Sequence, residues 1–496
     1  MRATTICTSA FPFVPATISL ANMTSTYVPA DCYARLLTVL GHESLHVTAV
    51  DVHSQFVSSD GRTRDGAAAI CDAKTIEYRR AFELMDIKLA SLPRTDAVAH
   101  VTTVREAIRT LLRLGAITQR QITTARCSSC GAVPPVRLMD GFDYERLGLA
   151  GESRESDQRR CPYCRGLAFH DVLSEHWFLR IEHMRAMLLI HCDRMLKTPT
   201  ARPLVRNWLA EPLPDWNISR DNEIGISLGP YLPGKSLYLW FEALLGYWSI
   251  APVNRDMPKR FAHFFGKNIL YYHAVVWPLL YALCYSGDPG DISLSARGLV
   301  NKQLSDPHLL DLAMATSVYH SDYLRFYMIW IATDSLSDVR LTTRTLIETV
   351  NNVLCDNVGN LLRRLGVILQ KRSPRSLRVE DGDPIAAMFH RAVVPAIRQA
   401  ADDLAVSRSL RIVVDYVGEL NRHVSTERLY QVDTDAVNGR IAFMIASVLT
   451  LLSPFLPRLV EDFNIFVGWE PGVVANIATA TLHPLKPLVG TWQKIT

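Results

Sequence analysis

Four of the ten cysteines occur as two closely spaced pairs that could bind a metal ion. The pairs are Cys127-Ser-Ser-Cys130 and Cys161-Pro-Tyr-Cys164, and thirty residues separate them. Two such turns supply four thiolates, which is a usual ligand set of a tetrahedral zinc ion. Because the set is complete without water or substrate, we expect the zinc to be structural. A redox-active dithiol, or two turns without metal, would have the same spacing.

The amino-acid composition is that of an ordinary globular protein with about two or three domains. The chain has 496 residues, of which 48% are hydrophobic and 21% charged, and its net charge is +4. This small charge permits a polyanionic partner without indicating one. We find no uncharged apolar run of about 18 residues and no signal-peptide pattern, so we expect no membrane span and a cytoplasmic location. The other cysteines stand singly among apolar residues, as in a reducing compartment.

The first part of the chain has the pattern of a parallel α/β unit. Residues 4–10 are predicted to form a buried strand, 30–41 a helix that ends at a glycine, and 44–52 a second strand. Helices are expected near 69–86 and 101–115. In such a unit the functional site lies at the C-terminal ends of the strands.

The rest of the chain consists of an insertion, a second α/β stretch and a helical half, in that order. The cysteine pairs lie in an insertion over about 117–170. The segments 236–250 and 261–285 return to strand and helix patterns. From residue 312 onward the pattern is helical, with apolar residues at three-to-four spacing in 344–370 and 436–456.

Segments spread over nearly the whole chain, taken in their order and spacing, resemble one known protein family. Together with the cysteine pairs they are AFPFVPATISLAN (10–22), LLTVLGHESLHVTAVDVHS (36–54), LPDWNISRD (213–221), GKSLYLWFEALLGYWS (234–249), HFFGKNILYYHAVVWP (263–278), SDYLRFYMIW (321–330), VNNVLCDNVGNLLRRLG (350–366) and LTLLSPFLP (449–457). The family is the class I methionyl-tRNA synthetases. Its members activate methionine with ATP to an adenylate and transfer the amino acid to tRNA.

The resemblance implies an α/β fold of three parts. A Rossmann-type class I catalytic domain is split by a zinc-bearing connective insertion, and an α-helical anticodon-binding domain follows. The corresponding residues are 1–116 for the first half of the catalytic domain, 117–232 for the insertion, 233–340 for the second half with its signature loop, and 341–496 for the helical domain.

Several residues match the amino-acid pocket of the family. Asp51 stands where the family has the carboxylate that binds the substrate ammonium group. Three positions in this region depart from the family pattern, since Phe13 replaces a tyrosine, Glu242 an aspartate and Leu244 a proline. Taken singly, the aromatic residues would also fit a plain hydrophobic core. The matching residues are Phe11, Phe13, Asp51, Trp240, Ala243, Tyr247, Tyr272 and His273.

The turn after the first strand lacks the charged groups that class I enzymes use on ATP. The family has a His-x-x-His signature there, whose imidazoles and helix N-terminus meet the α-phosphate in the transition state. The matching positions here are Ser19-Leu20-Ala21-Asn22, so neutral groups replace both imidazoles and Ala21 replaces a glycine. Ser19 and Asn22 can still donate neutral hydrogen bonds. We therefore expect impaired use of ATP without exclusion of the nucleotide.

The second ATP signature of the family, a mobile Lys-Met-Ser-Lys-Ser loop, is also degenerate. Its best counterpart is Asn301-Lys302-Gln303-Leu304-Ser305-Asp306-Pro307, in which Lys302 is the remaining cation and Ser305 a remaining serine. We expect the carboxylate of Asp306 to repel pyrophosphate at about 4–6 Å, and Pro307 to stiffen the loop. Asn268 replaces an aspartate expected near the ribose.

The helical half keeps part of the family's tRNA-reading pattern. Asn360 and Arg364 match a pair that reads anticodon bases and lie four residues apart on one helical face. Tyr430 stands where the family has a tryptophan that stacks on a base, and it keeps an aromatic face. A solvated helical face without tRNA contact would show the same residues.

We therefore expect a divergent paralogue that binds an amino acid, methionine or an analogue, with impaired or lost adenylation. Such a protein could serve regulation or a specialised biosynthetic pathway. Synthetase-like domains occur with a zinc-binding cupin in hydrazine synthetases that form nitrogen–nitrogen bonds, so a cupin would here be a separate partner protein. Two alternatives stay open: an active methionine–tRNA ligase that works through Ser19, Asn22 and Lys302, and a tRNA-binding module.

Overall fold

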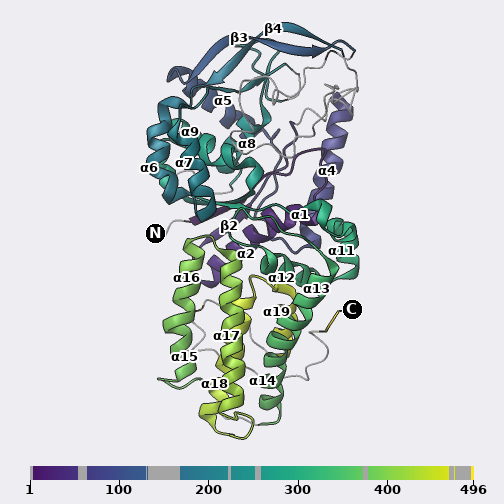
Figure 1. The fold of residues 1–496 in the computed structure, drawn as a ribbon, viewed down its shortest axis with the longest axis vertical. Helices are drawn as coiled ribbons and strands as arrows, with labels where there is room; N and C mark the ends of the chain where they lie inside the picture. The colour runs from purple at the N-terminus through teal and green to yellow at the C-terminus, as the bar shows by residue number, and fades with distance from the viewer. Residues whose placement is uncertain are drawn as a thin grey trace.

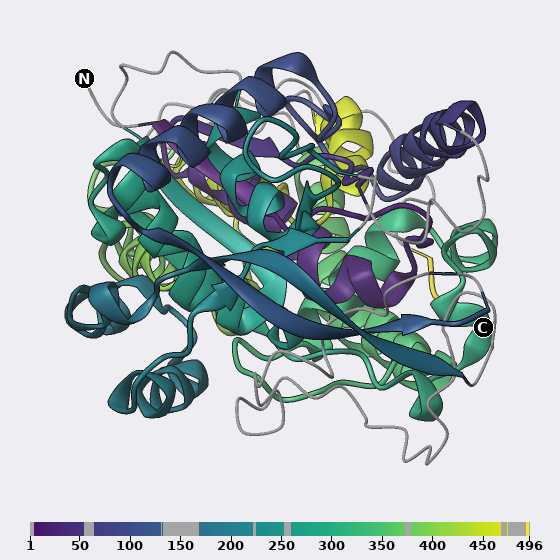
Figure 2. The same cartoon turned by 90° about the horizontal axis from the view of Figure 1, so that it is seen from above.

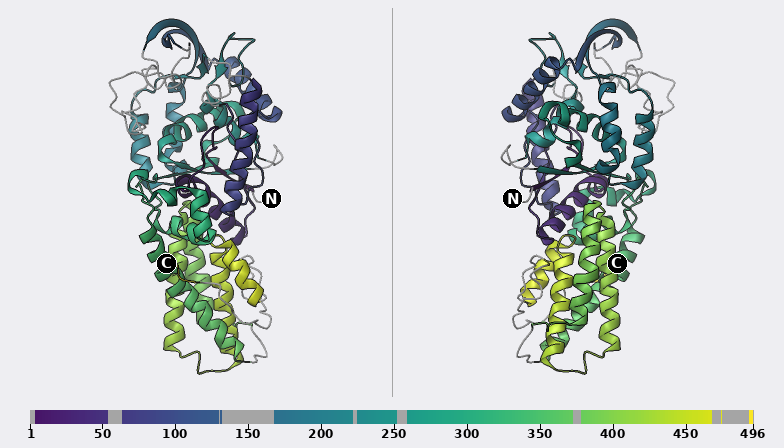
Figure 3. Two further views of the ribbon diagram at one scale, coloured as in Figure 1. Left: turned by 90° about the vertical axis from the view of Figure 1, so that its right-hand side faces the viewer. Right: turned by 90° about the vertical axis from the view of Figure 1, so that its left-hand side faces the viewer.

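The molecule consists of an α/β part and a helical part, which lie one above the other in Figure 1. The side views in Figure 3 show the same arrangement along the long axis. The helical part continues directly from the last strand of the α/β part. This computed structural model describes residues 4–53, 64–129, 131, 168–221, 225–251, 259–372, 378–467, 474 and 493–495.

A parallel sheet forms the centre of the α/β part. Its strands are β1 (Thr4–Ser9), β2 (Ser44–Val47), β8 (Lys259–Gly266) and β9 (Ile292–Arg297), in the order β2-β1-β8-β9. The chain passes from β1 to β2 in one direction and from β8 to β9 in the other, so the strand order reverses between β1 and β8. In open parallel sheets, ligands bind at such a reversal, outside the C-terminal ends of the strands.

Alternate side chains of the central strands enter two different hydrophobic cores. Cys7 on β1 and Phe264 on β8 belong to a core that continues into the helical part. Ile6 and Phe261 belong to a core on the opposite face of the sheet. The helices that cover this second core are α5 (Val98–Arg113), α8 (Leu239–Ser249) and α9 (Trp277–Tyr285), the last preceded by a π-helical turn at Tyr272–Val276.

The helix after β1 begins earlier than the sequence pattern predicts. It runs through α1 (Leu20–Asn22), a π-helical turn (Met23–Tyr27) and α2 (Val28–Val39). Pro29 suggests a helix start because it has no backbone N–H group to donate. The wider π turn before Pro29 lets the helical path continue through it. The prediction over 30–41 is therefore confirmed for helix and wrong for its start.

An insertion between the two halves of the sheet builds a long antiparallel ribbon. β3 (Ile117–Cys127) and β4 (Phe169–Leu179) pair along their full length, with Cys127 opposite Phe169. Figure 2 shows the ribbon lying across the α/β part. The segments that carry the two cysteine pairs therefore leave the ribbon at the same end. Other elements of this region are α6 (Arg185–Met195), α7 (Arg202–Ala210), β5 (Trp216–Asn217), β6 (Ser219–Arg220) and β7 (Ser236–Leu237).

The C-terminal part is a bundle of helices, as the sequence pattern predicts. Of the described helices, α18 (Asp435–Leu452) is long and apolar enough to cross a membrane by length and composition, but 78% of this span is buried in the protein. It serves here as a core helix. The other α- and π-helical elements from residue 307 onward are α10 (Pro307–Leu310), α11 (Leu312–Val318), α12 (Ser321–Ile331), α13 (Thr343–Glu348), a π-helical segment (Thr349–Gly359), α14 (Asn360–Gln370), α15 (Pro384–Met388), a π-helical turn (Phe389–Val393), α16 (Val394–Asp402), α17 (Val406–Thr426) and α19 (Pro457–Val467). In the α/β part, α4 (Arg64–Leu84) follows β2.

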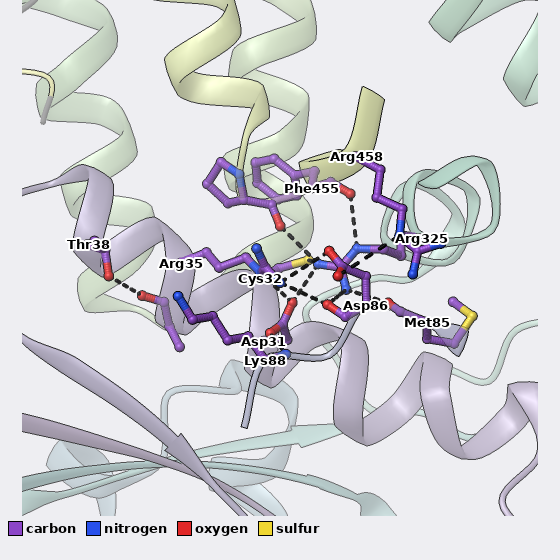
Figure 4. Close-up of polar contacts among 12 residues, drawn as sticks. Asp31, Cys32, Arg35, Thr38, Met85, Asp86, Lys88, Arg325, Phe455 and Arg458 are labelled. Atoms are coloured by element: carbon purple, nitrogen blue, oxygen red, sulfur yellow. Dashed lines mark hydrogen bonds and ion pairs between the residues drawn. The ribbon is translucent and has the colours of Figure 1, made fainter. Parts of the chain in front are cut away.

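A buried ion pair joins the two parts (Figure 4). Arg325 on α12 is fully buried, and its Nη2 lies 2.7 Å from Oδ2 of Asp31 on α2. The same guanidinium donates to the carbonyl oxygens of Phe455 and Met85 at 3.2 and 3.0 Å. Burial raises the pKa of Asp31, but Arg325 and Arg35 outweigh this effect and hold the pKa below its usual value. One arginine thus links α2, the end of α4, α12 and the turn before α19.

Replacing Arg325 with methionine is expected to lower the free energy of unfolding by up to about 3–5 kcal/mol, because the buried Asp31 would keep only the partly exposed Arg35 as an ion-pair partner and the hydrogen bonds of Arg325 to buried carbonyl oxygens would be lost. Urea unfolding followed by tryptophan fluorescence would measure the loss. Arg344→Met is the matched control, because the Arg344 side chain is 86% exposed and its pair with Glu348 on α13 should contribute little. Equal midpoints for the two variants would contradict the role given to Arg325.

Candidate functional site

The loop that follows β1 is held against the segment that follows β2. The backbone N–H of Asp51 donates to the carbonyl oxygen of Pro12, and the N–H of Val14 donates to the carbonyl oxygen of Asp51, each at 2.9 Å. The hydroxyl of Tyr78 on α4 lies 2.6 Å from the carbonyl oxygen of Ala16. Both loops are therefore fixed at the end of the sheet where the strand order reverses.

Aromatic side chains from α8 and from the π-helical turn after β8 meet beside these loops. Trp240 and Tyr272 stack with their ring centroids 5.2 Å apart. Phe11 packs on Tyr247 at 4.6 Å, and the Tyr247 hydroxyl lies 3.0 Å from Nε2 of His273. The structure thus brings together most of the predicted pocket residues, namely Phe11, Trp240, Ala243, Tyr247, Tyr272 and His273.

The hydrogen bonds around His273 fix which atom carries its proton. Burial lowers the pKa of His273 to about 4, so the imidazole is neutral. Its Nδ1 donates to the carbonyl oxygen of Ile269 at 2.8 Å, which leaves Nε2 to accept the hydroxyl proton of Tyr247. His263 stacks on His273 with centroids 4.5 Å apart and bonds to the Thr8 hydroxyl at 2.7 Å. The sequence pattern did not single out His263.

Asp51 lies in a buried environment that contains other charged groups. Its Oδ1 accepts the backbone N–H of His53 at 3.1 Å. Burial and the nearby carboxylate of Glu242 raise the pKa of Asp51 to about 7. Glu242 on α8 is fully buried, and its Oε1 lies 2.6 Å from Nδ1 of His53. This pair was not predicted, because 189 positions separate the two residues in the sequence.

Phe13 differs from the other predicted pocket residues. Its side chain is 42% exposed, although its backbone forms a bridge with that of Asp51. Tyr247 and His273 are at the other extreme, because both are fully buried. The alternative of a plain aromatic core therefore stays open for the deepest residues and does not account for Phe13.

Ser19 and Asn22, predicted as weak donors to ATP, bond to each other. The side-chain oxygen of Asn22 accepts from the backbone N–H of Ser19 at 3.0 Å and from its hydroxyl at 2.9 Å. This arrangement caps the start of α1. Two of the donors that a phosphate would need at this helix start are therefore engaged within the protein.

The segment matching the second ATP signature is folded into a tight turn. The side chain of Asn301 accepts the backbone N–H groups of Gln303 and Leu304, both at 3.1 Å. The hydroxyl of Ser305 donates to the carbonyl oxygen of Asn301 at 2.6 Å. Lys302, in the same turn, is exposed. The segment is closed by its own hydrogen bonds, so it does not have the form of an open phosphate-binding loop.

Asp306 has a role that the sequence pattern did not predict. Its Oδ2 accepts the backbone N–H of Thr343 at 2.7 Å and the hydroxyl of Thr343 at 2.8 Å. These hydrogen bonds hold the pKa of Asp306 below its usual value. The carboxylate thus binds the start of α13. The prediction that it acts mainly by repelling pyrophosphate left this structural function out.

Asn360 and Arg364 line a groove of about 540 Å³ between α14 and α17. The guanidinium of Arg364 lies 3.4 Å from the hydroxyl of Ser425, and the amide of Asn421 donates to Oδ1 of Asn357 at 2.8 Å. Tyr430 lies in the segment after α17, is 53% exposed and does not line the groove. The structure therefore joins two of the three predicted tRNA-contact residues in one groove.

A family model described as tRNA synthetases class I (M) matches residues 5–366, which is most of the chain. The chain belongs to the methionyl-tRNA synthetase family. A methionine–tRNA ligase of Ignicoccus hospitalis is 25% identical in sequence, and the matched region spans 94% of this chain and 90% of that ligase. A methionine–tRNA ligase of Pyrobaculum arsenaticum is 24% identical, with coverage of 98% and 94%.

A solved structure has the same fold. Mycobacterium tuberculosis methionyl-tRNA synthetase bound by methionyl-adenylate superposes with a TM-score of 0.78 at 18% identity, covering 99% of this chain and 100% of the other. The prediction of a class I synthetase fold with a parallel sheet is thereby confirmed.

The zinc ligands expected from the methionyl-tRNA synthetase family fall mostly outside the described residues. The structure does not describe Cys130, Cys161 and Cys164. Cys127 ends β3 and is fully buried. The N–H of Gly131 donates to the carbonyl oxygen of Cys127 at 2.9 Å, and Gly131 has a φ of 72°, which favours glycine. The zinc stays a prediction.

Gly246→Ala tests how closely the candidate pocket of this family member is packed. A Cβ atom at Gly246 would lie 2.6 Å from Cε2 of Phe11. We expect a lower free energy of unfolding. Overpacking costs about 1–3 kcal/mol, whereas the higher helix propensity of alanine contributes only about 1 kcal/mol in the favourable direction. Gly418→Ala on α17 is the control, because no heavy atom lies within 4 Å of its Cβ position. It should be neutral or stabilising in the same urea titration, and a stabilising Gly246→Ala would contradict the packing described.

Proposed function

We propose that this protein is a methionyl-tRNA synthetase paralogue that binds an amino acid and performs ATP-dependent adenylation poorly or not at all. The observation that carries the proposal is the mutual hydrogen bonding of Ser19 and Asn22, at the positions where the family uses two histidines on ATP. The closed turn around Asn301 supports it from the second signature. Neither segment offers the paired cations that stabilise developing negative charge.

The amino-acid side of the proposal rests on the residues gathered between α8 and the two loops. Asp51 would hold the ammonium group of the ligand, and the aromatic residues would surround its side chain. Phe13, Glu242 and Leu244 depart from the family pattern. We therefore propose that the ligand is either methionine or an analogue of methionine. Mycobacterium tuberculosis methionyl-tRNA synthetase, which has the same fold, binds methionyl-adenylate, and this supports an amino-acid ligand for the present protein.

We place the protein in a specialised biosynthetic or regulatory role in the cytoplasm. A nitrogen–nitrogen bond-forming pathway is one such role, with a separate zinc-binding cupin as partner. A structural zinc held by Cys127, Cys130, Cys161 and Cys164 would close the end of the β3–β4 ribbon. That metal would fix the tip of the insertion and take no part in chemistry on the ligand.

Calorimetry and pyrophosphate exchange together test this function. We expect the wild-type protein to bind methionine or an analogue in calorimetry, while methionine-dependent ATP–pyrophosphate exchange is absent or very slow. The physical reason is that loss of one transition-state donor reduces the rate by about 10²–10³-fold, and two histidines are replaced here.

Ser19→His/Asn22→His is the matched variant, and it should raise any exchange above the wild-type rate. Exchange by the wild-type protein at about 1–10³ per second would favour the alternative, an active methionine–tRNA ligase. The similarity to curated ligases over more than 90% of this chain keeps that alternative in view.

The groove between α14 and α17 favours a second function, binding of tRNA. Arg364→Ala is expected to weaken tRNA binding by about tenfold, since a specific arginine–base contact contributes about 1–3 kcal/mol. Filter binding at several salt concentrations would measure it. Arg398→Ala on α16 is the control, because Arg398 is exposed and lies outside the groove. Equal affinities of the two variants, or binding that does not depend on salt, would exclude tRNA recognition by this groove.

A further inference from the structure

A buried group of charged side chains lies beside the proposed ammonium site. Asp51 and His53 come from the loop after β2, and Glu242 comes from α8. Asp51 is 2% exposed and Glu242 is fully buried, while His53 Nδ1 and Glu242 Oε1 lie only 2.6 Å apart. A distance this short is typical of a charge-assisted hydrogen bond. The arrangement therefore places the His53 imidazole against the buried Glu242 carboxyl, while the backbone N–H of His53 donates to Oδ1 of Asp51 at 3.1 Å.

Two buried carboxyl groups that repel each other do not both ionise without a compensating cation, and Asp51 and Glu242 form such a pair. An ammonium ligand needs Asp51 in its ionised form, yet burial and Glu242 both raise the pKa of Asp51. The charge of His53 has the largest effect in the opposite direction, and hydrogen bonds from the His53 backbone N–H and the Thr95 side chain also lower this pKa. Burial would lower the pKa of His53, but Glu242 outweighs it and the pKa rises to about 9. The imidazole is therefore charged at neutral pH.

Of the other titratable groups near this cluster, Arg94 carries a positive charge, but its guanidinium is hydrogen-bonded to both carboxylate oxygens of Asp96, and the remaining groups are neutral or negative. His100 on α5 has its Nε2 3.8 Å from Oε2 of Glu242, but burial lowers its pKa to about 4. Asp96 adds a further negative charge near His53. The groups on α4 and α8 that face Asp51 are neutral, because burial raises the pKa values of Cys71, Tyr78 and Tyr247.

We infer that His53 is a positioning residue whose imidazolium, hydrogen-bonded to Glu242, keeps the Asp51 carboxylate ionised for the ammonium group of the amino acid. This inference rests on the proposed amino-acid site. Two carboxylates and one imidazolium leave one negative charge, which the ligand ammonium neutralises. Glu242 thus acts through His53 without contacting the ligand.

The charge states set the pH dependence of binding. Below about pH 7 Asp51 takes up a proton and loses its attraction for an ammonium group. Above about pH 9 His53 loses its proton, which leaves the two carboxylates without their cation. Affinity should therefore rise as the pH increases through about 7. The amino group of the ligand also loses its proton at alkaline pH, so the rising limb is the part of the profile that reports on Asp51 and His53.

Calorimetric titration with L-methionine, from about pH 5.5 to about pH 9.5, tests the functional consequence. His53→Asn should reduce affinity at neutral pH at least tenfold and move the rising limb to higher pH. His100→Asn is the matched control, since it removes a buried neutral imidazole that faces the same Glu242. It should keep the wild-type pH profile, whatever its affinity. A His53→Asn profile identical to that of the wild type would overturn the inference.

A measurement without ligand separates the inference from the proposed function. Nuclear magnetic resonance of protein with isotope-labelled histidine would measure the titration of His53. The His53 signal is assigned as the one that disappears in His53→Asn. It should be that of a charged imidazole that titrates near pH 9. Glu242→Gln should lower that pKa, and this variant still decides the question if His53→Asn does not fold. If the protein binds methionine but the His53 imidazole is neutral at neutral pH, the inference is wrong and the proposed amino-acid site stands. A charged imidazole with no methionine binding at any pH would overturn the amino-acid site and with it the inference.

Discussion

The arrangement of the whole chain depends on a charge pair placed where water does not reach it. Arg325 and Asp31 are both buried, and each satisfies the other while the guanidinium also holds the carbonyl oxygen of Phe455 (Figure 4). Asp31 lies on the helical path that begins at Ser19, directly after the loop that carries Phe11. The helical part therefore anchors the element that positions the site. Because an unpaired buried charge is costly, the two parts have a strong reason to keep one relative orientation.

The two hydrophobic cores explain why the site forms where it does. Side chains of β1 alternate between them, so Cys7 packs with the helical part and Ile6 packs under α5, α8 and α9. The loops after β1 and β2 contribute to both cores, with Val14 and Val50 in the first and Phe11 and Ala49 in the second. Polar groups such as the Asp51 carboxyl are buried there because the walls on either side exclude water. The low polarity is what makes the local charges interact strongly.

Local sequence patterns predicted the helices and strands and part of the candidate site. They could not predict contacts between residues that are distant in the sequence. Trp240, Ala243 and Tyr247 were assigned to the pocket by the resemblance to the family, and their spacing along α8 agrees with one helical face. The cap formed by Ser19 and Asn22 also had a local signal, since a serine followed three residues later by an amide side chain is typical of a helix start. The pairs His53–Glu242 and Asp306–Thr343 join segments distant in the sequence, so no periodicity could indicate them.

The two halves of the site differ in the kind of interaction they offer a ligand. A phosphate at the start of α1 would compete with the Asn22 carbonyl for the N–H and hydroxyl of Ser19. Each such exchange of neutral hydrogen bonds changes the free energy by only about 0.5–1.5 kcal/mol, which is a weak substitute for two cationic imidazoles. In the proposed amino-acid site, an ammonium group would instead meet the Asp51 carboxylate, whose ionised form the His53–Glu242 pair supports. On this proposal, the same fold would lose its hold on the nucleotide and keep its hold on the amino group.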